Sequence, residues 1–255
     1  MTLKEFFEKY NRLALGFSGG VDSSYLLWAA LHYGAEVGAY YVSTAFQPEF
    51  EKRDALRLAR SLGVSPVIIE KDILSCAEVA ANPKDRCYYC KRQIFGAISS
   101  RALSDGYTVL LDGTNASDDA SDRPGMRALQ ELSVLSPLRM CGLTKEEIRR
   151  KSKEAGLFTW NKPAYACLAT RTPAGEALTA RILRRTEQAE TALHELGFRD
   201  FRVRHSREIP TIEVTAGQMD FLSAERERVS AILRECGYDE SRLITKLRNT
   251  AGKPV

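Results

Sequence analysis

The sequence predicts an α/β protein with a doubly wound parallel sheet, followed by a small α+β domain. Two observations support this fold class. Short apolar runs alternate with helical patterns through the first two thirds of the 255 residues, and strands separated by helices form parallel sheets covered on both faces. The pattern then changes near Thr172-Pro173-Ala174-Gly175, beyond which the elements are shorter. We therefore expect one domain at 1–172 and a second at 173–255.

In the first domain the apolar runs predict four strands, at Leu13–Phe17, Glu36–Val42, Pro66–Glu70 and Thr108–Asp112. Helical periodicity predicts the elements between and after them, at about Ser24–Leu31, Phe50–Leu62, Tyr89–Leu103 and Lys145–Ala155. Gly63 and Gly156 follow two of these helices, as residues that end helices commonly do.

The second domain has a helical pattern at Ile182–Leu196, which Gly197 ends, and another at Ala224–Cys236. Three short runs predict its strands, at Phe201–His205, Thr211–Val214 and Arg242–Leu247. This mixture of strands and helices is the basis for expecting a small α+β domain.

Composition limits the function classes. Apolar residues make up 44% of the chain and charged residues 27%, with a net charge of +4, as in ordinary globular proteins. This charge permits anionic ligands but does not indicate a strongly basic nucleic-acid binder. Because no long apolar run or signal-peptide pattern occurs, we expect a cytoplasmic protein without membrane contact. Six cysteines then indicate thiols or metal ligands.

The segment Ser18-Gly19-Gly20-Val21-Asp22-Ser23 carries the most specific chemistry. It joins a predicted buried strand to a predicted helix, so its amides can point at a phosphate. It lacks the Gly-Lys-Ser/Thr of a Walker A loop. The plainer interpretation is a Gly-rich turn with a helix cap. Ligands of doubly wound sheets bind beyond the strand ends, which places this loop, Ser43 and the loop after Asp112 over one crevice.

Cysteines provide the second candidate site. Cys87 and Cys90 form a Cys-x-x-Cys pair, and Cys167 lies in a loop of small residues. The pair can chelate a metal, form a redox disulfide or be incidental. Three thiolates can also hold a cubane iron–sulfur cluster and leave one iron open for an extra sulfide.

With these motifs in order, the chain resembles the LarE family within the PP-loop ATP pyrophosphatases (adenine nucleotide alpha hydrolase-like fold). The likeness spans roughly Leu3 to Tyr238. Beyond Ser18–Ser23, it rests on Asp85–Lys91, Asp112-Gly113, Arg123-Pro124-Gly125, Trp160-Asn161-Lys162, Cys167–Arg171, Arg202-Val203-Arg204 and Ile212-Glu213.

The resemblance implies an ATP-dependent sulfur transferase that serves nickel-pincer cofactor biosynthesis. ATP adenylates a pyridinium carboxylate on a mononucleotide and releases pyrophosphate, and sulfur then displaces AMP to form a thiocarboxylate. One branch of the family sacrifices the cysteine matching Cys167. The other carries all three cysteines and uses a 4Fe–4S cluster, and the Cys-x-x-Cys pair favours this branch. Implied cofactors are ATP, Mg²⁺ and the cluster.

The resemblance also assigns residues. Cys167, Asp22 and Lys91 are the expected catalytic residues, and Ser18, Gly19, Gly20, Asp22, Ser23, Ser43, Arg86 and Asp112 the expected nucleotide or Mg²⁺ site. Lys91 and Arg86 can offset charge on the departing pyrophosphate. Arg202 and Arg204 share one face of a predicted strand, and we expect them to bind substrate phosphate near a subunit interface of a homo-oligomer. Glu190, Glu213 and Asp220 match acidic positions proposed for a second metal.

Three alternatives remain open from the sequence. A tRNA thiolase also combines this loop with cysteines, although no zinc-knuckle pair accompanies them here. An amide-forming synthetase related to NAD synthetase would use the same adenylation without needing three cysteines. A nucleotide-sensing module would bind ATP without turnover, and pyrophosphate release would separate it from an enzyme.

Overall fold

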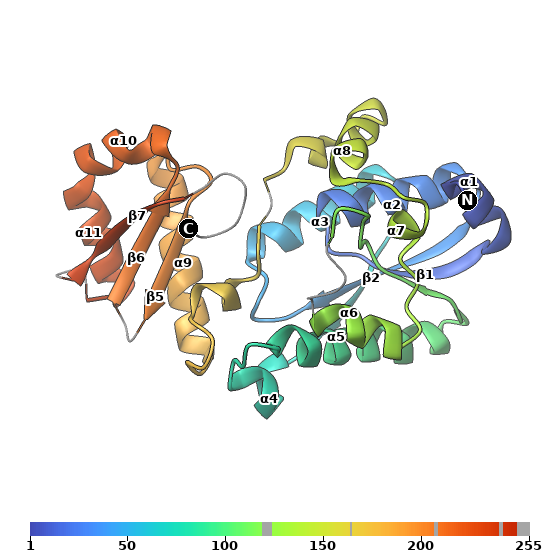
Figure 1. Ribbon diagram of the computed structural model, residues 1–255, viewed down its shortest axis with the longest axis horizontal. Helices are drawn as coiled ribbons and strands as arrows, with labels where there is room; N and C mark the ends of the chain where they lie inside the picture. The colour runs from blue at the N-terminus through green and yellow to red at the C-terminus, as the bar shows by residue number, and fades with distance from the viewer. Residues whose placement is uncertain (119–123, 164, 207–208, 240–241, 249–255) are drawn as a thin grey trace. The chain divides into compact units, whose positions relative to one another are not determined.

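The computed structural model describes residues 1–118, 124–163, 165–206, 209–239 and 242–248. It divides into two compact units (Figure 1), unit 1 with residues 1–73 and 85–162 and unit 2 with 74–84 and 163–255. The division after residue 162 lies ten positions before the expected one. Arg123, a residue of one family motif, lies outside the described residues.

Segment 74–84 belongs to unit 2 because hydrogen bonds hold it there. The amide of buried Asn82 donates to the carbonyl oxygens of Pro173 at 2.8 Å and Glu176 at 3.1 Å. Gly175 N–H donates back to the Asn82 carbonyl at 2.8 Å. Residues ninety positions away along the chain thus satisfy polar groups that a separate loop would leave buried and unpaired.

Unit 1 contains the predicted doubly wound parallel sheet, and that prediction is confirmed. Its strands β1 (Arg12–Gly16), β2 (Glu36–Ser43), β3 (Val67–Glu70) and β4 (Leu110–Leu111) are all parallel, in the order β3-β2-β1-β4. An isolated parallel bridge between Leu111 and Leu135 extends pairing beyond β4. The helices are α1 (Leu3–Lys9), α2 (Val21–His32), α3 (Glu49–Ser61), α5 (Arg86–Ser104), α6 (Pro124–Glu131), α7 (Pro137–Met140), α8 (Lys145–Glu154) and η2 (Phe158–Asn161).

Alternating strand residues supply two cores, one on each face of this sheet. Leu13, Leu15 and Tyr41 pack into the core formed with α1, α2, α3, α7 and α8. Ala14, Tyr40 and Val42 pack instead into the core formed with α5 and α6. Figure 1 shows these two groups of helices on opposite sides of the strands. Side chains one position apart point to opposite faces, so near-continuous apolar runs serve both cores.

Unit 2 is built on a second, three-stranded sheet in the order β5-β6-β7. Strands β5 (Arg202–Ser206) and β6 (Ile209–Val214) are antiparallel, and β7 (Ile244–Leu247) runs parallel to β6. The remaining elements are η1 (Ile73–Ser75, at the boundary), α4 (Ala77–Ala80), η3 (Leu168–Arg171), α9 (Ala180–Leu196), η4 (Ala216–Gln218), α10 (Met219–Ala224) and α11 (Arg226–Glu235).

The core of unit 2 forms where α9, α10 and α11 cover the sheet. Ala189, Val203, Ile212, Leu222 and Leu233 are among its fully or nearly fully buried residues. The helix predicted over Ala224–Cys236 is interrupted at Glu225, which caps α10 and precedes α11.

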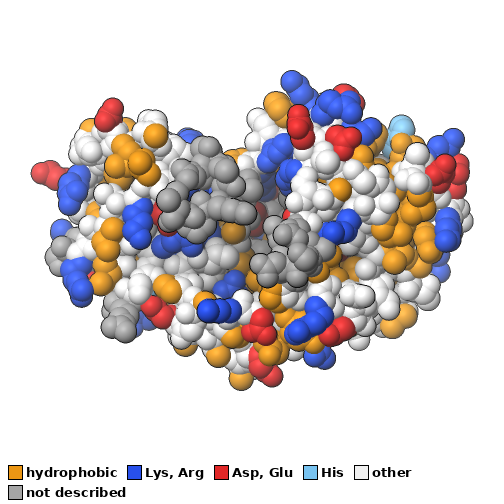
Figure 2. All heavy atoms as spheres, in the orientation of Figure 1, with side chains coloured by type: hydrophobic (Ala, Val, Ile, Leu, Met, Phe, Trp, Pro, Cys, Tyr) orange, Lys and Arg blue, Asp and Glu red, His pale blue; other side chains and the backbone are white. Residues whose placement is uncertain are grey.

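Charged side chains of both signs lie on the surface of each unit (Figure 2). Lys and Arg side chains alternate with Asp and Glu side chains on the face of each unit drawn in Figure 2. Within the described residues, no helix combines the length and the apolar content that crossing a bilayer requires.

Candidate functional site

The turn between β1 and α2 has a backbone that only glycine accommodates. Gly19 has φ +71°, and a Cβ added there would lie 2.5 Å from the Cβ of Ala55 and 2.6 Å from its Cα. These distances are far inside van der Waals contact, and the contacted atoms lie on or next to the α3 backbone. Gly19 therefore lets the turn pack directly on α3, and Gly20 begins α2 as its N-cap.

Two serines hold this turn in shape. The Oγ atoms of Ser18 and Ser23 are 3.0 Å apart, and Ser23 Oγ also donates to the Gly20 carbonyl at 3.3 Å. Gly20 N–H donates to Ser18 Oγ at 3.4 Å. No side chain among the described residues caps the start of α2. The start of α2 thus keeps amides that no N-cap side chain satisfies, beside its positive dipole end, and helices bind phosphate with such groups.

The loop after β4 packs on the first turn of α2. A Cβ added to Gly113 would lie 3.0 Å from Ser23 N and 3.3 Å from Ser23 Cα. This close approach joins two segments that the sequence analysis placed over one crevice.

Asp22 lies in the first turn of α2 and forms an ion pair that the sequence did not predict. Its Oδ2 accepts from Lys145 Nζ, at the start of α8, at 2.7 Å. Its Oδ1 is enclosed and forms no hydrogen bond of standard geometry among the described residues, although the Asn115 side chain lies close to the carboxylate. Burial raises the pKa of Asp22, and the positive charge of Lys145 and the Asn115 side chain oppose that change. A second cation or donor would satisfy the remaining oxygen.

Asp112, at the end of β4, is 4% exposed and is held by hydroxyl groups. Ser136 Oγ donates to its Oδ1 at 2.6 Å, and Thr114 Oγ1 donates to its Oδ2. Lys91 Nζ lies 3.7 Å from the same Oδ2. The aliphatic part of Lys91 passes the start of α6, where a Cβ on Gly125 would be 3.1 Å from Lys91 Cδ. Asp112 and Gly125 together aim the ammonium group of Lys91 at the strand end.

Ser43 ends β2 beside a second ion pair. Lys52 Nζ donates to Ser43 Oγ at 3.4 Å and to Glu70 Oε1, at the end of β3, at 3.0 Å. Hydrogen bonds from Ser43 and Lys52 lower the pKa of Glu70. Unit 1 thus places the Ser18–Ser23 turn, Ser43 and Asp112 at the carboxyl ends of its parallel strands, where such sheets bind ligands.

The Cys-x-x-Cys pair lies in the first turns of α5. Cys87 is exposed, Cys90 is half-buried, and their spacing puts both on one helix face. Tyr88 between them is buried and donates to Glu131 Oε2 at 2.7 Å, which ties α5 to α6. Arg86 begins the helix and is also buried. Both sulfurs therefore lie close to the N-terminus of α5.

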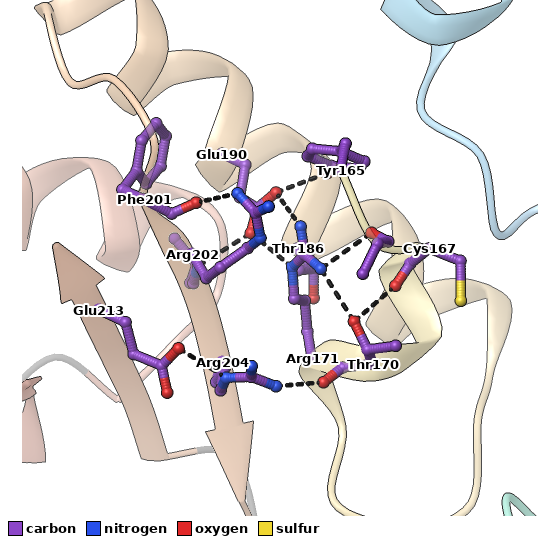
Figure 3. A network of polar contacts seen from close by, with 12 residues as sticks. Tyr165, Cys167, Thr170, Arg171, Thr186, Glu190, Phe201, Arg202, Arg204 and Glu213 are labelled. Carbon is purple, nitrogen blue, oxygen red and sulfur yellow. Dashed lines mark hydrogen bonds and ion pairs between the residues drawn. The ribbon is translucent and has the colours of Figure 1, made fainter. Parts of the chain in front are cut away.

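Cys167 belongs to unit 2, so the prediction that all three cysteines converge stays a prediction. Cys167 is the N-cap of η3, and its carbonyl accepts from Thr170 N at 2.9 Å and from Thr170 Oγ1 at 2.8 Å. Its sulfur points away from Arg171 and Glu190 (Figure 3).

Arg202 and Arg204 lie on one face of β5, as predicted, but have different surroundings. Arg202 is buried, donates to the Phe201 carbonyl at 2.6 Å and lies 5.0 Å from the ring centroid of Tyr165. Burial, with the positive charges of Arg171 and Arg248, lowers the pKa of Arg202 to about 10. Arg204 pairs with Glu213 at 2.8 Å and donates to the Thr170 carbonyl.

The three acidic residues expected at a second metal do not form a common ligand set. Glu190 on α9 binds Arg171, and Glu213 on β6 binds Arg204 (Figure 3). Asp220 is exposed on α10. Within neither unit do three His, Cys, Asp or Glu side chains of the described residues gather as metal ligands. The second metal at Glu190, Glu213 and Asp220 stays a prediction.

Sequence comparison relates the chain to enzymes that transfer sulfur. No family model matches. The pyridinium-3,5-bisthiocarboxylic acid mononucleotide synthase of Lactiplantibacillus plantarum is 30% identical over 239 residues, which are 93% of this chain and 87% of the synthase. The uncharacterized protein slr1717 of Synechocystis sp. is 34% identical over 86% of this chain and 82% of its own. The tRNA-specific 2-thiouridylase MnmA of Thermotoga sp. is 28% identical over 59% of this chain and 54% of the thiouridylase.

Replacing Gly19 with alanine tests whether the turn depends on its contact with α3. Gly34 is the matched control, because it has φ +78° but open space around it. We expect Gly34→Ala to lower the free energy of unfolding by about 1 kcal/mol through backbone strain alone. Gly19→Ala adds overpacking against Ala55, about 1–3 kcal/mol more. Urea unfolding of both variants measures the difference, and equal losses would contradict the packing argument.

Proposed function

The chain belongs to the LarE family of PP-loop sulfur transferases, and from that premise we propose that it converts a carboxylate of a pyridinium mononucleotide into a thiocarboxylate. In this proposal it consumes ATP, releases pyrophosphate and AMP, and serves biosynthesis of the nickel-pincer nucleotide cofactor. The observation that carries the proposal is the uncapped start of α2, placed beside Asp22, Lys145 and Lys91 at one sheet edge.

The turn after β1 is the proposed site of the β and γ phosphates. Its amides and the dipole of α2 stabilise negative charge, and they stabilise more of it as pyrophosphate departs. Lys91 is the proposed neighbour of the α–β bridge, since Asp112 fixes its ammonium group at the end of β4. Arg86, buried at the start of α5, supplements this positive charge.

Asp22 fits a magnesium ion better than Asp112 does. One oxygen of Asp22 is enclosed and forms no hydrogen bond of standard geometry among the described residues, whereas both oxygens of Asp112 accept from hydroxyls. Carboxylate oxygens are the ligands that Mg²⁺ prefers, together with phosphate oxygens. When bound, Mg²⁺ would neutralise charge on the phosphates. Asp112 instead orients Lys91.

The proposed chemistry has two displacements. A carboxylate oxygen of the substrate attacks the α phosphorus, and the bond from that phosphorus to the bridging oxygen breaks, so the electron pair leaves with pyrophosphate. A sulfur nucleophile then attacks the carbonyl carbon, and the bond from this carbon to the AMP oxygen breaks. The products are a thiocarboxylate and AMP.

Cys87, Cys90 and Cys167 are the proposed ligands of a 4Fe–4S cluster. Their donor chemistry fits, because such clusters are held by thiolates and the two cysteines of α5 share a face. With three ligands the cluster supplies an iron open to sulfide. The competing source is the sulfur of Cys167 itself, lost when the Cβ–S bond breaks after proton removal from Cα.

Arg202 and Arg204 are the proposed site for the substrate's phosphate. Burial and neighbouring cations lower the pKa of Arg202, so an anion beside it would offset an unfavourable charge. Guanidinium groups suit phosphate because they donate two parallel hydrogen bonds. Arg204 would contribute from the same face while remaining bound to Glu213.

A tRNA acceptor is the alternative that the comparisons also raise. The thiouridylases share 59% of this chain and 54% of their own length with it, which supports common ATP chemistry. The likeness to the mononucleotide synthase extends over 87% of that enzyme. We therefore favour the small carboxylate acceptor.

Product analysis with a pyridinium carboxylate mononucleotide tests the proposed function. We expect AMP and pyrophosphate, formed only when the acceptor is present, and no turnover with tRNA. Asp22→Ala should abolish turnover while retaining cooperative thermal unfolding, because a loop-edge carboxylate adds little to the core. Glu146→Ala, an exposed carboxylate beside Lys145, is the matched control and should remain active. ADP and orthophosphate as main products would refute the proposal.

Iron analysis of anaerobically reconstituted protein tests the sulfur source. We expect about four irons per chain, lost on replacing Cys87, Cys90 or Cys167 with alanine. Cys76→Ala and Cys141→Ala should keep the iron. If turnover instead leaves Cys167 lighter by about 34 Da, the mass of lost H₂S, and Cys87→Ala stays active, Cys167 alone is the donor.

A further inference from the structure

A buried ion pair joins α9 to η3 in unit 2. Arg171 is 1% exposed and Glu190 7%. Arg171 Nε lies 2.7 Å from Glu190 Oε1, and its Nη2 lies 3.0 Å from Oε2, so the pair is bidentate. Both charges are removed from water, and such a pair persists only where further hydrogen bonds satisfy both partners.

Glu190 is satisfied on both oxygens. Besides Arg171, its Oε1 accepts from Val203 N–H at 2.9 Å and its Oε2 accepts from the Tyr165 hydroxyl. Burial and the negative charge of Glu190 raise the pKa of Tyr165, so this hydroxyl stays a donor. The carboxylate is therefore used as an anchor for three segments, which is the role that its geometry supports in place of metal binding.

Arg171 connects the buried ion pair to the loop that carries Cys167. Its Nη1 donates to the Ala166 carbonyl and to Thr170 Oγ1, both at 2.9 Å. Thr170 in turn donates its hydroxyl and its amide to the Cys167 carbonyl. The connection runs without a break from Glu190 through Arg171 and Thr170 to the backbone of Cys167 (Figure 3).

Strand β5 adds a second attachment to the same loop. Arg204 donates to the Thr170 carbonyl, while its Nε pairs with Glu213 at 2.8 Å. The backbone of η3 is thus held from α9 and from β5. The sulfur of Cys167 points away from both attachments, so they fix its base without covering it (Figure 3).

We propose that Thr170 and Arg171 are positioning residues for Cys167, with Glu190 as their buried anchor. The inference deepens the proposed function, on which it rests: whether Cys167 donates its sulfur or binds a cluster, transfer to an acyl adenylate needs the cysteine at a fixed place. Misplacement of a reacting group by about 1 Å can cost on the order of a hundredfold in rate. The attack on ATP takes place at the proposed phosphate site of unit 1, so loss of the Thr170 hydroxyl should slow sulfur transfer more than adenylation.

Thr170→Val is the decisive variant, because valine has the shape of threonine without the hydroxyl. It removes the hydrogen bond from Arg171 Nη1 and the hydroxyl's bond to the Cys167 carbonyl, and it leaves the amide's bond to that carbonyl and the buried ion pair in place. We expect the residue 170 amide to exchange hydrogen about tenfold faster, the effect of losing one such hydrogen bond. Thr170→Ser should restore wild-type exchange, and Thr191→Val, an exposed threonine of α9, should leave it unchanged.

Two further measurements distinguish positioning from general destabilisation. Alkylation by iodoacetamide, followed peptide by peptide in the full chain, should change rate at Cys167 several-fold in Thr170→Val but not at Cys87 or Cys90. With substrate, Thr170→Val should release pyrophosphate in the first turnover at the wild-type rate but form less thiocarboxylate and AMP. Arg171→Lys, which keeps the charge but loses the fork, should show the same pattern more strongly.

Wild-type exchange at residue 170 and unchanged alkylation of Cys167 in Thr170→Val would overturn the inference. Binding of one Mn²⁺ per chain that Glu190→Gln abolishes would overturn it too, since Glu190 would then be a metal ligand. If wild-type protein forms no thiocarboxylate, the proposed function fails. The exchange and alkylation results, which need no substrate, would still decide the positioning role.

Discussion

The contact between Gly19 and Ala55 is the constraint on which the proposed nucleotide site depends. It presses the turn after β1 onto α3 so closely that no side chain fits at residue 19. Gly19 takes a left-handed backbone conformation there, and Gly20 directly after it is the N-cap of α2. Gly113 then packs on the first turn of that helix. A strand, two helices and the loop after β4 meet at one place because two glycines remove the side chains that would separate them.

The sequence was sufficient for the parts of this arrangement that depend on local pattern. Apolar runs located all four strands of unit 1, and the Ser18–Ser23 motif located the turn. Lys145 could not be predicted from pattern, because it meets Asp22 from 123 positions away and resembles any lysine at a charged helix start. The hydroxyls of Thr114 and Ser136 were missed for the same reason, since their partner Asp112 is chosen by the fold.

The partners of the carboxylates in unit 2 could not be predicted from the sequence. The sequence predicted a metal at Glu190 and Glu213 but did not predict that each neutralises an arginine of its own unit. The sequence pattern around a glutamate is the same whether it binds a metal or an arginine. Only the fold shows that an arginine lies beside each of these two carboxylates. The strand pattern did predict that Arg202 and Arg204 share a face, because a period of two is a local property. It did not predict that Arg202 is buried against Tyr165.

The two units hold their proposed functional residues in place by different interactions. In the proposed function, unit 1 uses glycine packing and helix amides to bind the phosphates that leave as pyrophosphate. Unit 2 holds its cysteine loop with buried charges, whose removal from water is costly unless every partner is present. Such a network has one satisfied arrangement, which suits a loop that must present a single sulfur in a fixed position.

The account's central claim is that the carboxylate of the substrate attacks the α phosphorus of ATP. A mononucleotide labelled with ¹⁸O in its carboxylate tests this directly, because the attacking oxygen stays with AMP when sulfur displaces it. Mass spectrometry should find one ¹⁸O in the AMP formed for each carboxylate converted. AMP without the label, formed at the same rate as the thiocarboxylate, would show that the carboxylate is not adenylated.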